Sequence, residues 1–158
     1  MPRKKKRVKK IHKEAKWPRV TSFEERDEVL SFWEERFGIP KEAFEGYLLL
    51  STSKNYWLFV ELPDIKPLQG LKVQTVGLLF TRRVSHWLKP TSTALQRFGH
   101  LAQKNIIDLS PAELDRLRRE RKIPFSAEVE EGYVILRCEG KVWGCGLYVK
   151  KSLISFLP

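Results

Sequence analysis

The residues best suited to chemistry by their type are two cysteines and three histidines. The cysteines are Cys138 and Cys145, and the histidines are His12, His86 and His100. Thiolate and imidazole are ligands that zinc prefers, but a structural zinc site needs four of them at short spacings. The histidines lie far from the cysteines along the chain, and a separation of six residues between two cysteines fits no zinc knuckle. We therefore expect two free, buried thiols, with no metal and no cofactor.

The segment that holds both cysteines, GYVILRCEGKVWGCGLYVK at 132–150, predicts a β-hairpin. A turn at Glu139–Gly140 or at Gly140–Lys141 places the two cysteines on one apolar face, at closest as diagonal neighbours with Cα atoms about 8 Å apart. That separation exceeds the usual reach of a disulfide. Because two cysteines in 158 residues make no disulfide framework, a reducing compartment is expected.

The opposite face of this hairpin contains two glycines, Gly144 and Gly146, at positions i and i+2. Glycines spaced in this way weaken a strand, so their presence needs a cause. Three explanations are open. The glycines can mark a bulge, they can lie at a corner where a small barrel closes tightly, or they can allow another backbone to approach, which for a basic protein could be a sugar–phosphate chain.

The net charge of +11 is unevenly distributed along the chain. Residues 1–19 hold ten Lys or Arg and one acid, whereas residues 20–64 hold four basic and ten acidic side chains. Residues 65–122 hold twelve basic and four acidic side chains, and residues 123–158 hold four of each. The first and third of these regions are therefore the natural surfaces for an anionic partner.

Residues 1–19 form a basic arm without apolar periodicity, and we expect this arm to be disordered when free. Its densest run, which could neutralise phosphates without selecting a base sequence, is Lys4, Lys5, Lys6 and Arg7. The same composition is typical of a nuclear-import peptide or a solubilising tail. We favour contact with nucleic acid and keep the other two interpretations open.

The elements that would position these residues can be recognised from their capping residues and apolar patterns. Ser22 begins a helix that ends at Gly38. The apolar stripe of this helix, which we expect to face the core, consists of Phe23, Leu30, Trp33 and Phe37. The segment 47–61 predicts a hairpin, and 71–80 predicts a third strand.

The second half of the chain predicts further short helices and strands. A helix is expected over 91–98, a strand over 104–109, and a second helix from Pro111, capped by Ser110. Together with the hairpin at 132–150, these elements predict an α+β fold around a small β-barrel. The expected regions are a basic arm at 1–19, a small N-terminal α+β subdomain at 20–84 and a barrel domain at 85–158.

The closing segment, EEGYVILRCEGKVWGCGLYVKKSLISFLP, resembles the end of PUA-like RNA-binding domains. The likeness is greatest to the domain at the C-terminus of Sun/Fmu-type RNA cytosine-5 methyltransferases, which ends in a G-x-G-x-V-K strand and a final L-x-x-x-L-P. This chain keeps Gly144, Gly146, Val149–Lys150 and residues 153–158, with one residue inserted before the Val-Lys pair. Upstream, TALQRFGHLAQKNIIDLS is similar to the helix–glycine–strand entry of these domains, and QTVGLLFTRR is similar to the strand that joins their preceding subdomain. The resemblance covers roughly residues 40–158.

The resemblance implies a pseudo-barrel, packed on the N-terminal subdomain, that binds structured RNA. In this family the RNA surface comes from the first helix, the glycine-containing turn and strand after it, and the last strand. The matching positions in this chain are Arg97, Gly99, His100, Lys104, Gly146, Lys150 and Lys151. By charge alone, we add three neighbours in the basic middle of the chain: Arg82, Arg83 and Lys89.

Two groups of residues are left out of this expected surface. Trp87 and Trp143 could stack on bases, but we expect them in the core. The preference of a helix C-terminus for positive charge explains a run of cations near residue 120, namely Arg118, Arg119, Arg121 and Lys122.

Methyltransferase activity itself is not expected. The chain has no glycine-rich loop between a strand and a helix to hold a cofactor. It also has no Pro-Cys nucleophile, because Arg137 precedes Cys138 and Gly144 precedes Cys145. The Ser85–His86 pair has no acid or base partner at a spacing that would indicate a catalytic arrangement. We expect no enzymatic activity.

We therefore expect a stand-alone, monomeric RNA-binding protein that recognises a folded tRNA or rRNA element. Its role would be accessory to RNA modification or ribosome biogenesis, in the cytoplasm or, for a eukaryotic source, the nucleus or nucleolus. No apolar run is long enough for a membrane helix, so no membrane partner is expected. DNA is compatible with the charge, but no helix-turn-helix reading element is evident. The alternative function is that of an adaptor whose acidic first helix docks on a catalytic RNA-modifying subunit.

Overall fold

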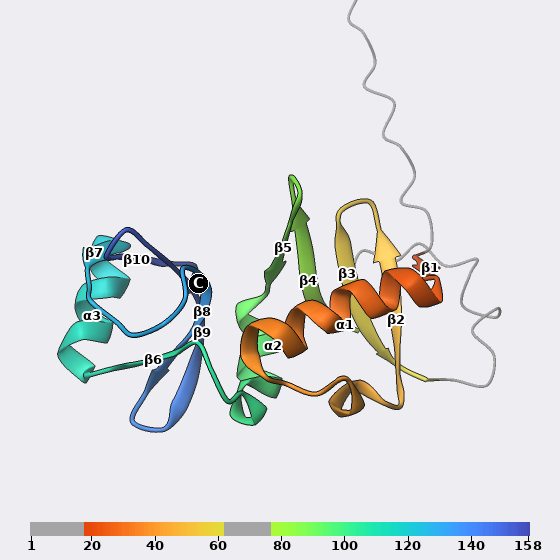
Figure 1. Ribbon diagram of the computed structural model, residues 1–158, viewed down its shortest axis with the longest axis horizontal. Helices are drawn as coiled ribbons and strands as arrows, with labels where there is room; N and C mark the ends of the chain where they lie inside the picture. Colours follow the sequence, from red (N-terminus) through yellow and green to blue (C-terminus); the bar gives the residue numbers. More distant parts are fainter. Residues whose placement is uncertain (1–17, 62–76) are drawn as a thin grey trace, which may run out of the picture.

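The structure is a computed structural model, and it describes residues 18–61 and 77–158. These residues form two five-stranded sheets and three α-helices, which confirms the expected α+β class. The basic run from Lys4 to Arg7 lies outside the described residues, as does most of the strand expected at 71–80. Figure 1 shows the two sheets next to each other, the first crossed by a long helix and the second curled on itself.

The long helix, α1 (Phe23–Phe37), begins and ends as its sequence predicts. The Ser22 hydroxyl accepts a hydrogen bond from the Glu25 N–H at 3.2 Å. The helix ends at Gly38, whose φ of +70° is a left-handed conformation that glycine adopts without strain. From Leu30 onward, the expected apolar stripe is buried.

The first turn of α1 differs from the expectation, because Phe23 is 79% exposed. The inward position of this turn, four residues before Leu30, is occupied by Arg26. Its guanidinium donates to the carbonyl oxygens of Phe44 at 3.1 Å and Tyr47 at 2.9 Å. A charged side chain therefore closes the core at this end of the helix, and Phe23 lies outside it.

The first sheet is antiparallel, and its strands are adjacent in sequence order. They are β1 (Arg19–Val20), β2 (Tyr47–Thr52), β3 (Asn55–Val60), β4 (Leu78–Val84) and β5 (Trp87–Pro90). The hairpin expected at 47–61 is confirmed as β2 and β3. Arg19, which was expected in the arm, pairs with β2 and forms an ion pair with Glu25 at 2.9 Å, so it belongs to the first sheet.

The second sheet has one parallel and three antiparallel pairings in the described part of the chain. In spatial order its strands are β6 (Ile106–Leu109), β8 (Gly132–Cys138), β9 (Lys141–Val149), β10 (Ser152–Ser155) and β7 (Lys122–Pro124). The parallel pair is β6 with β8. In the sequence, α3 (Pro111–Glu120) lies between β6 and β7. It is capped by Ser110 as expected, and Ser110 and Glu113 form a capping box.

The passage from the first sheet to the second occurs at α2 (Ser92–Phe98), which packs on β4 and on β9. β5 still belongs to the first sheet, because it pairs with β4 from Thr81–Pro90 to Val84–Trp87. The domain boundary expected after residue 84 therefore falls inside the β4–β5 hairpin. The first sheet extends to Pro90.

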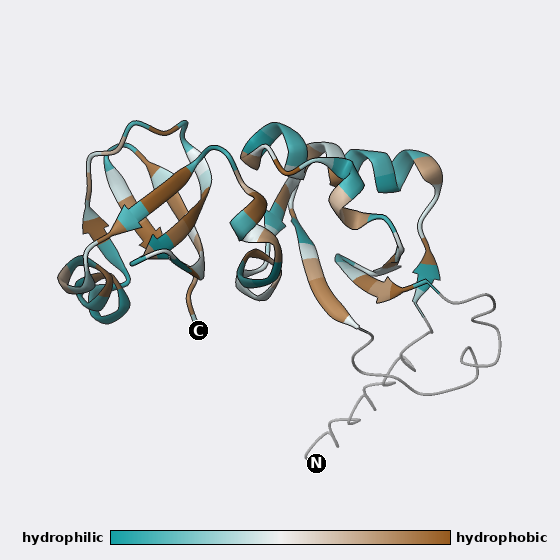
Figure 2. Ribbon diagram, turned by 90° about the horizontal axis from the view of Figure 1, so that it is seen from below, coloured by the Kyte–Doolittle hydropathy of each residue, from teal (hydrophilic) through white to brown (hydrophobic). Residues whose placement is uncertain are grey.

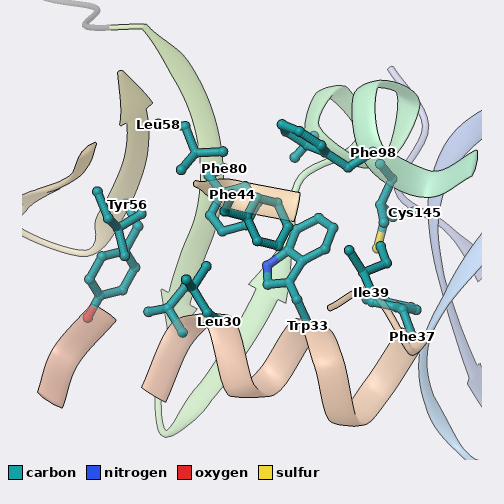
Figure 3. Close-up of a cluster of buried hydrophobic side chains, with 14 of the residues drawn as sticks. Leu30, Trp33, Phe37, Ile39, Phe44, Tyr56, Leu58, Phe80, Phe98 and Cys145 are labelled. Atoms are coloured by element: carbon teal, nitrogen blue, oxygen red, sulfur yellow. The ribbon is translucent and has the colours of Figure 1, made fainter. Parts of the chain in front are cut away.

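One apolar core connects the two sheets (Figure 3). Trp33 of α1 stacks on Phe80 of β4 with 4.5 Å between ring centroids, and its Nε1–H donates to the Thr81 hydroxyl at 2.9 Å. The same cluster includes Phe98 from α2 and Cys145 from β9. A second cluster lies within the second sheet and α3. Figure 2 shows apolar residues concentrated in the strands, and hydrophilic ones on α1 and α3.

The closing hairpin of β8 and β9 is confirmed, with its turn at Glu139–Gly140. It contains a bulge, one of the causes considered for the two glycines, because Trp143 is an extra residue in β9. Cys145 consequently pairs with Ile135 and faces the core between the sheets, whereas Cys138 faces the cluster within the second sheet. The two thiols lie on opposite faces of the hairpin, so the expectation of a shared face was wrong.

Candidate nucleic-acid interface

The two glycines that the resemblance placed at the RNA surface, Gly99 and Gly146, are buried. A Cβ added to Gly99 would lie 3.2 Å from both γ-methyl groups of Val142. A Cβ added to Gly146 would lie 3.0 Å from the Ile154 carbonyl oxygen. These close approaches are made by protein atoms, which corrects the expectation that the two glycines contact RNA. Tight closure of a small sheet is therefore the explanation that fits the pair of glycines in the hairpin, Gly144 and Gly146.

The β4–β5 hairpin brings two of the expected cations together on one face. Arg82 pairs with Lys89 across the hairpin, and Val84 pairs with Trp87. Because alternate residues of a strand share a face, these four side chains lie on the same side. We call Arg82, Val84, Trp87 and Lys89 the hairpin face. It presents one pair of cations next to an exposed apolar pair, which lies nearer the turn of the hairpin.

Arg83, the third cation proposed by charge, lies on the opposite side of the hairpin. Its guanidinium donates to the Glu28 carboxylate and to the Tyr56 hydroxyl, each at 3.1 Å. Both hydrogen bonds raise the pKa of Arg83, and the one to Tyr56 has the larger effect. On the same side, Leu88 packs on the core between the sheets. Arg83 therefore anchors the hairpin to α1 and to β3 rather than contributing to the hairpin face.

The hairpin face is turned toward the second sheet. The Lys89 ammonium lies 3.3 Å from the centroid of the Phe156 ring, in the segment that follows β10. Figure 1 shows β5 as the strand of the first sheet next to the second. Burial lowers the pKa of Lys89, and the positive charge of Arg82 lowers it further, while Cys145 acts in the opposite sense. A like-charged pair is thus held side by side, at an energetic cost.

A group of half-buried apolar side chains lies beside Phe156 on the second sheet. Tyr133 pairs with Leu147, which pairs in turn with Ile154, so these three share a face. The Phe156 ring lies 6.2 Å from the Tyr133 ring. We call Tyr133, Leu147, Ile154 and Phe156 the second-sheet patch. Burial raises the pKa of the Tyr133 hydroxyl, which remains a neutral donor at physiological pH.

The residues expected from the helix–glycine–strand entry are exposed, and each lies beside a different part of the protein. Arg97 lies near the Tyr47 hydroxyl, at 3.5 Å from Nη2. His100 is exposed in the short 3₁₀ turn after α2, and Lys104 is exposed where its N–H meets the carbonyl of Phe37, at 3.3 Å. These side chains remain available to a ligand, although they do not form a cluster with the hairpin face.

Lys150 and Lys151 form the exposed turn between β9 and β10, with φ values of +48° and +54°. The Lys150 N–H donates to the Glu131 carboxylate at 2.8 Å. Val142, which Gly99 contacts, lies near the other end of β9, about 23 Å from Val149 by strand geometry. The entry residues and this turn are therefore well separated, and a single ligand would have to be of macromolecular size to contact both.

The two cysteines are free and buried. Burial raises the pKa of the Cys145 thiol to about 12. Burial also raises the pKa of Cys138, with a smaller effect from the charge of Glu139. Both thiols are thus protonated at neutral pH and weakly nucleophilic. Within the described residues, no group of three or more potential ligands is arranged to hold a metal ion.

Trp143 has a different environment from Trp87. Its ring centroid lies 5.4 Å from the Arg118 guanidinium carbon and 4.7 Å from the Lys141 ammonium. These three residues line a shallow depression of about 370 Å³, which also contains Asp115 and Glu139. Because the carboxylates offset the cations, this depression has no net charge to attract an anion.

Sequence analysis missed Trp87 as a surface residue, since it placed both tryptophans in the core. The structure leaves 71% of Trp87 exposed. Strand alternation could have indicated this result: Leu88 packs on the core, so its neighbour Trp87 faces outward. Phe156 was also missed, because its contact with Lys89 joins residues far apart in the sequence.

Neither a comparison with models of known protein families nor a search among curated proteins finds a match for this chain. Of the helices in 18–61 and 77–158, none has both the length and the apolar character needed to cross a bilayer.

Proposed function

We propose that this protein is a non-catalytic RNA-binding protein that recognises structured RNA, such as a tRNA or rRNA element, as an accessory to RNA modification or ribosome biogenesis. In this proposal, α2 and the second sheet form a PUA-like barrel packed on the first sheet. Support comes from the order of its elements: a helix, a strand, a second helix, a short strand, a long hairpin and a final strand. The parallel pairing of β6 with β8 makes this sheet mixed, which is compatible with a pseudo-barrel.

The observation that carries the proposal is the pairing of Arg82 with Lys89 on the hairpin face. Like charges directly opposite each other destabilise a sheet. In the described part of the chain, neither cation forms an ion pair with a carboxylate. Phosphates bound by these two cations would relieve the repulsion. A polyanion with regularly spaced phosphates could also reach the exposed cations of α2 and of the β9–β10 turn.

The test is the salt dependence of RNA binding by the full chain, measured by fluorescence anisotropy with a labelled tRNA transcript. Affinity should fall steeply with salt, and deletion of residues 1–16 should flatten the slope, because the arm carries phosphate contacts. Replacing Arg82 and Lys89 by glutamine should reduce the logarithmic slope by about 1.5 and weaken binding about tenfold.

The matched control replaces Arg116 and Arg119 by glutamine. This pair removes the same charge from α3, where each guanidinium is already paired with a carboxylate of its own helix. It should change the slope by less than about 0.5. Absence of RNA affinity at low salt would overturn the proposed function. An equal effect of the two double variants would show that only the net charge matters.

A second candidate function, a protein-interaction adaptor, is favoured by the start of α1. Phe23 is 79% exposed beside Glu24, and an exposed aromatic among carboxylates suits a partner surface that is apolar with a basic rim. If purified protein shows no RNA affinity but retains one copurifying protein that Phe23→Ala releases, the adaptor function replaces the first proposal.

A further inference from the structure

Trp87 is the most exposed tryptophan among the described residues, with 71% of its surface accessible to solvent. Its cross-strand partner, Val84, is 47% exposed. Exposed indole rings carry a hydrophobic penalty in water, so an apolar pair of this size at a hairpin tip favours an interaction site.

The hairpin that carries Trp87 is firmly held from its other face. Leu88 is packed against the core, and Arg83 is bonded to Glu28 and to Tyr56. The connection between the two strands is a tight turn in which Ser85 has a φ of +56°. Trp87 is therefore presented by an anchored strand and not by a long loop, and little conformational entropy is lost when it binds.

The surroundings of Trp87 decide which kind of partner fits. Arg82 and Lys89 share its face, and the chain contains no Asp or Glu from Gly77 to Ile107. A typical protein surface would bring carboxylates and amines in similar numbers, whereas RNA brings phosphates together with flat aromatic bases. The charge of the hairpin face therefore favours RNA over a protein partner.

We propose that Trp87 stacks on an unpaired base of the RNA while Arg82 and Lys89 hold the phosphates on either side of it. This inference rests on the proposed RNA-binding function and adds the class of RNA element recognised. Bases in a continuous duplex are covered by their neighbours, so only a bulge, loop or single-stranded end offers a free base face.

The experiment compares two labelled RNAs with the full chain: a duplex of about 16 base pairs, and the same duplex with a bulge of about three uridines. The wild-type protein should prefer the bulged RNA about tenfold, because stacking stabilises one base by roughly that factor or more. Trp87→Ala should abolish this preference and leave binding to the uninterrupted duplex within about twofold. Trp87→Phe should retain most of the preference, since phenylalanine also stacks.

Phe23→Ala is the matched control, because it removes an aromatic ring of similar exposure from the acidic helix. It should leave the preference for the bulge intact. A circular-dichroism melting curve checks that each variant is folded.

If the wild type binds both RNAs equally, or if Trp87→Ala keeps the preference, the inference is wrong while the proposed function stands. If the wild type binds neither RNA, both are wrong. Loss of a copurifying protein on Trp87→Ala with RNA binding unchanged would make this face a protein-docking surface and would also overturn the inference.

Discussion

The β8–β9 and β4–β5 hairpins differ in how many of their faces are buried. In β8–β9, Ile135 and Cys145 pack into the core between the sheets, while Leu136 and Tyr148 pack into the cluster within the second sheet. In β4–β5, one face packs on the core and the other, with Trp87, meets solvent. The glycine-bearing hairpin is thus explained by packing alone, and the hairpin with an ordinary sequence is the one that exposes a face to solvent.

The largest expected effect is the loss of stability on replacing Gly144 by alanine in the β8–β9 hairpin, which is buried on both faces. Gly144 has a φ of +150°, and an added Cβ would lie 2.5 Å from the Ser92 hydroxyl oxygen and 2.8 Å from a methyl group of Leu157. Strain and overpacking together should lower the free energy of unfolding by about 3 kcal/mol, measured by urea denaturation. Gly140→Ala is the control, because Gly140 also has a positive φ but nothing within 4 Å of an added Cβ. It should cost about 1 kcal/mol, and equal losses would mean that conformation, and not close packing, requires glycine at 144.

An intermediate effect is expected on replacing Ser92 by alanine, since the Ser92 hydroxyl joins α2 to the β8–β9 hairpin. It accepts a hydrogen bond from the Cys145 N–H at 3.0 Å and donates to the Phe156 carbonyl at 3.2 Å. Without it, a buried N–H loses its partner, which should cost about 1–2 kcal/mol in the free energy of unfolding. Thr93→Ala, at an exposed position of the same helix, should change stability by less than about 0.5 kcal/mol. A Ser92→Ala variant as stable as the wild type would show that the two hydrogen bonds contribute nothing.

The smallest expected effect concerns the exposed ion pair between β6 and β8. Arg137 donates to both carboxylate oxygens of Asp108, at 2.6 and 2.8 Å, and this contact lowers the pKa of Asp108. Because the Asp108 side chain is 62% exposed, Asp108→Asn should cost less than about 1 kcal/mol at pH 7. A carboxylate with a lowered pKa stabilises the fold above its ordinary pKa of 3.8 and loses that effect as the pH falls through the lowered pKa. The difference between wild type and variant should therefore disappear on acidification, and a difference that grows instead would exclude this origin.

Much of the secondary structure could be predicted because it depends on local chemistry. Ser22, Gly38 and Ser110 mark helix ends through hydrogen bonds and conformations within a few residues. The boundary expected after residue 84 falls inside the β4–β5 hairpin, because strand pairing is a tertiary feature that neither the charge pattern nor the resemblance could report. The first turn of α1 was misassigned because periodicity treats Phe23 like the later apolar residues, whereas the tertiary structure uses Arg26 to close the core.

The candidate interface was predictable only in part. Arg82 and Lys89 could be proposed from charge, and the structure shows that they share a face. The inward placement of Gly146 depends on the bulge at Trp143, which exchanges the two faces of β9. The glycines suggested a bulge as one possible cause, but they did not fix its position. The separation of the β9–β10 turn from the entry residues also depends on tertiary structure. Trp87 was missed because its size suggested burial, although alternation with Leu88 directed it outward.

The core that joins Trp33, Phe98 and Cys145 has a consequence for stability. Both sheets contribute side chains to this one cluster, so neither sheet can be removed without exposing buried apolar side chains of the other. We therefore expect that cleavage between the two halves, or a spacer inserted between them, would destabilise both halves together.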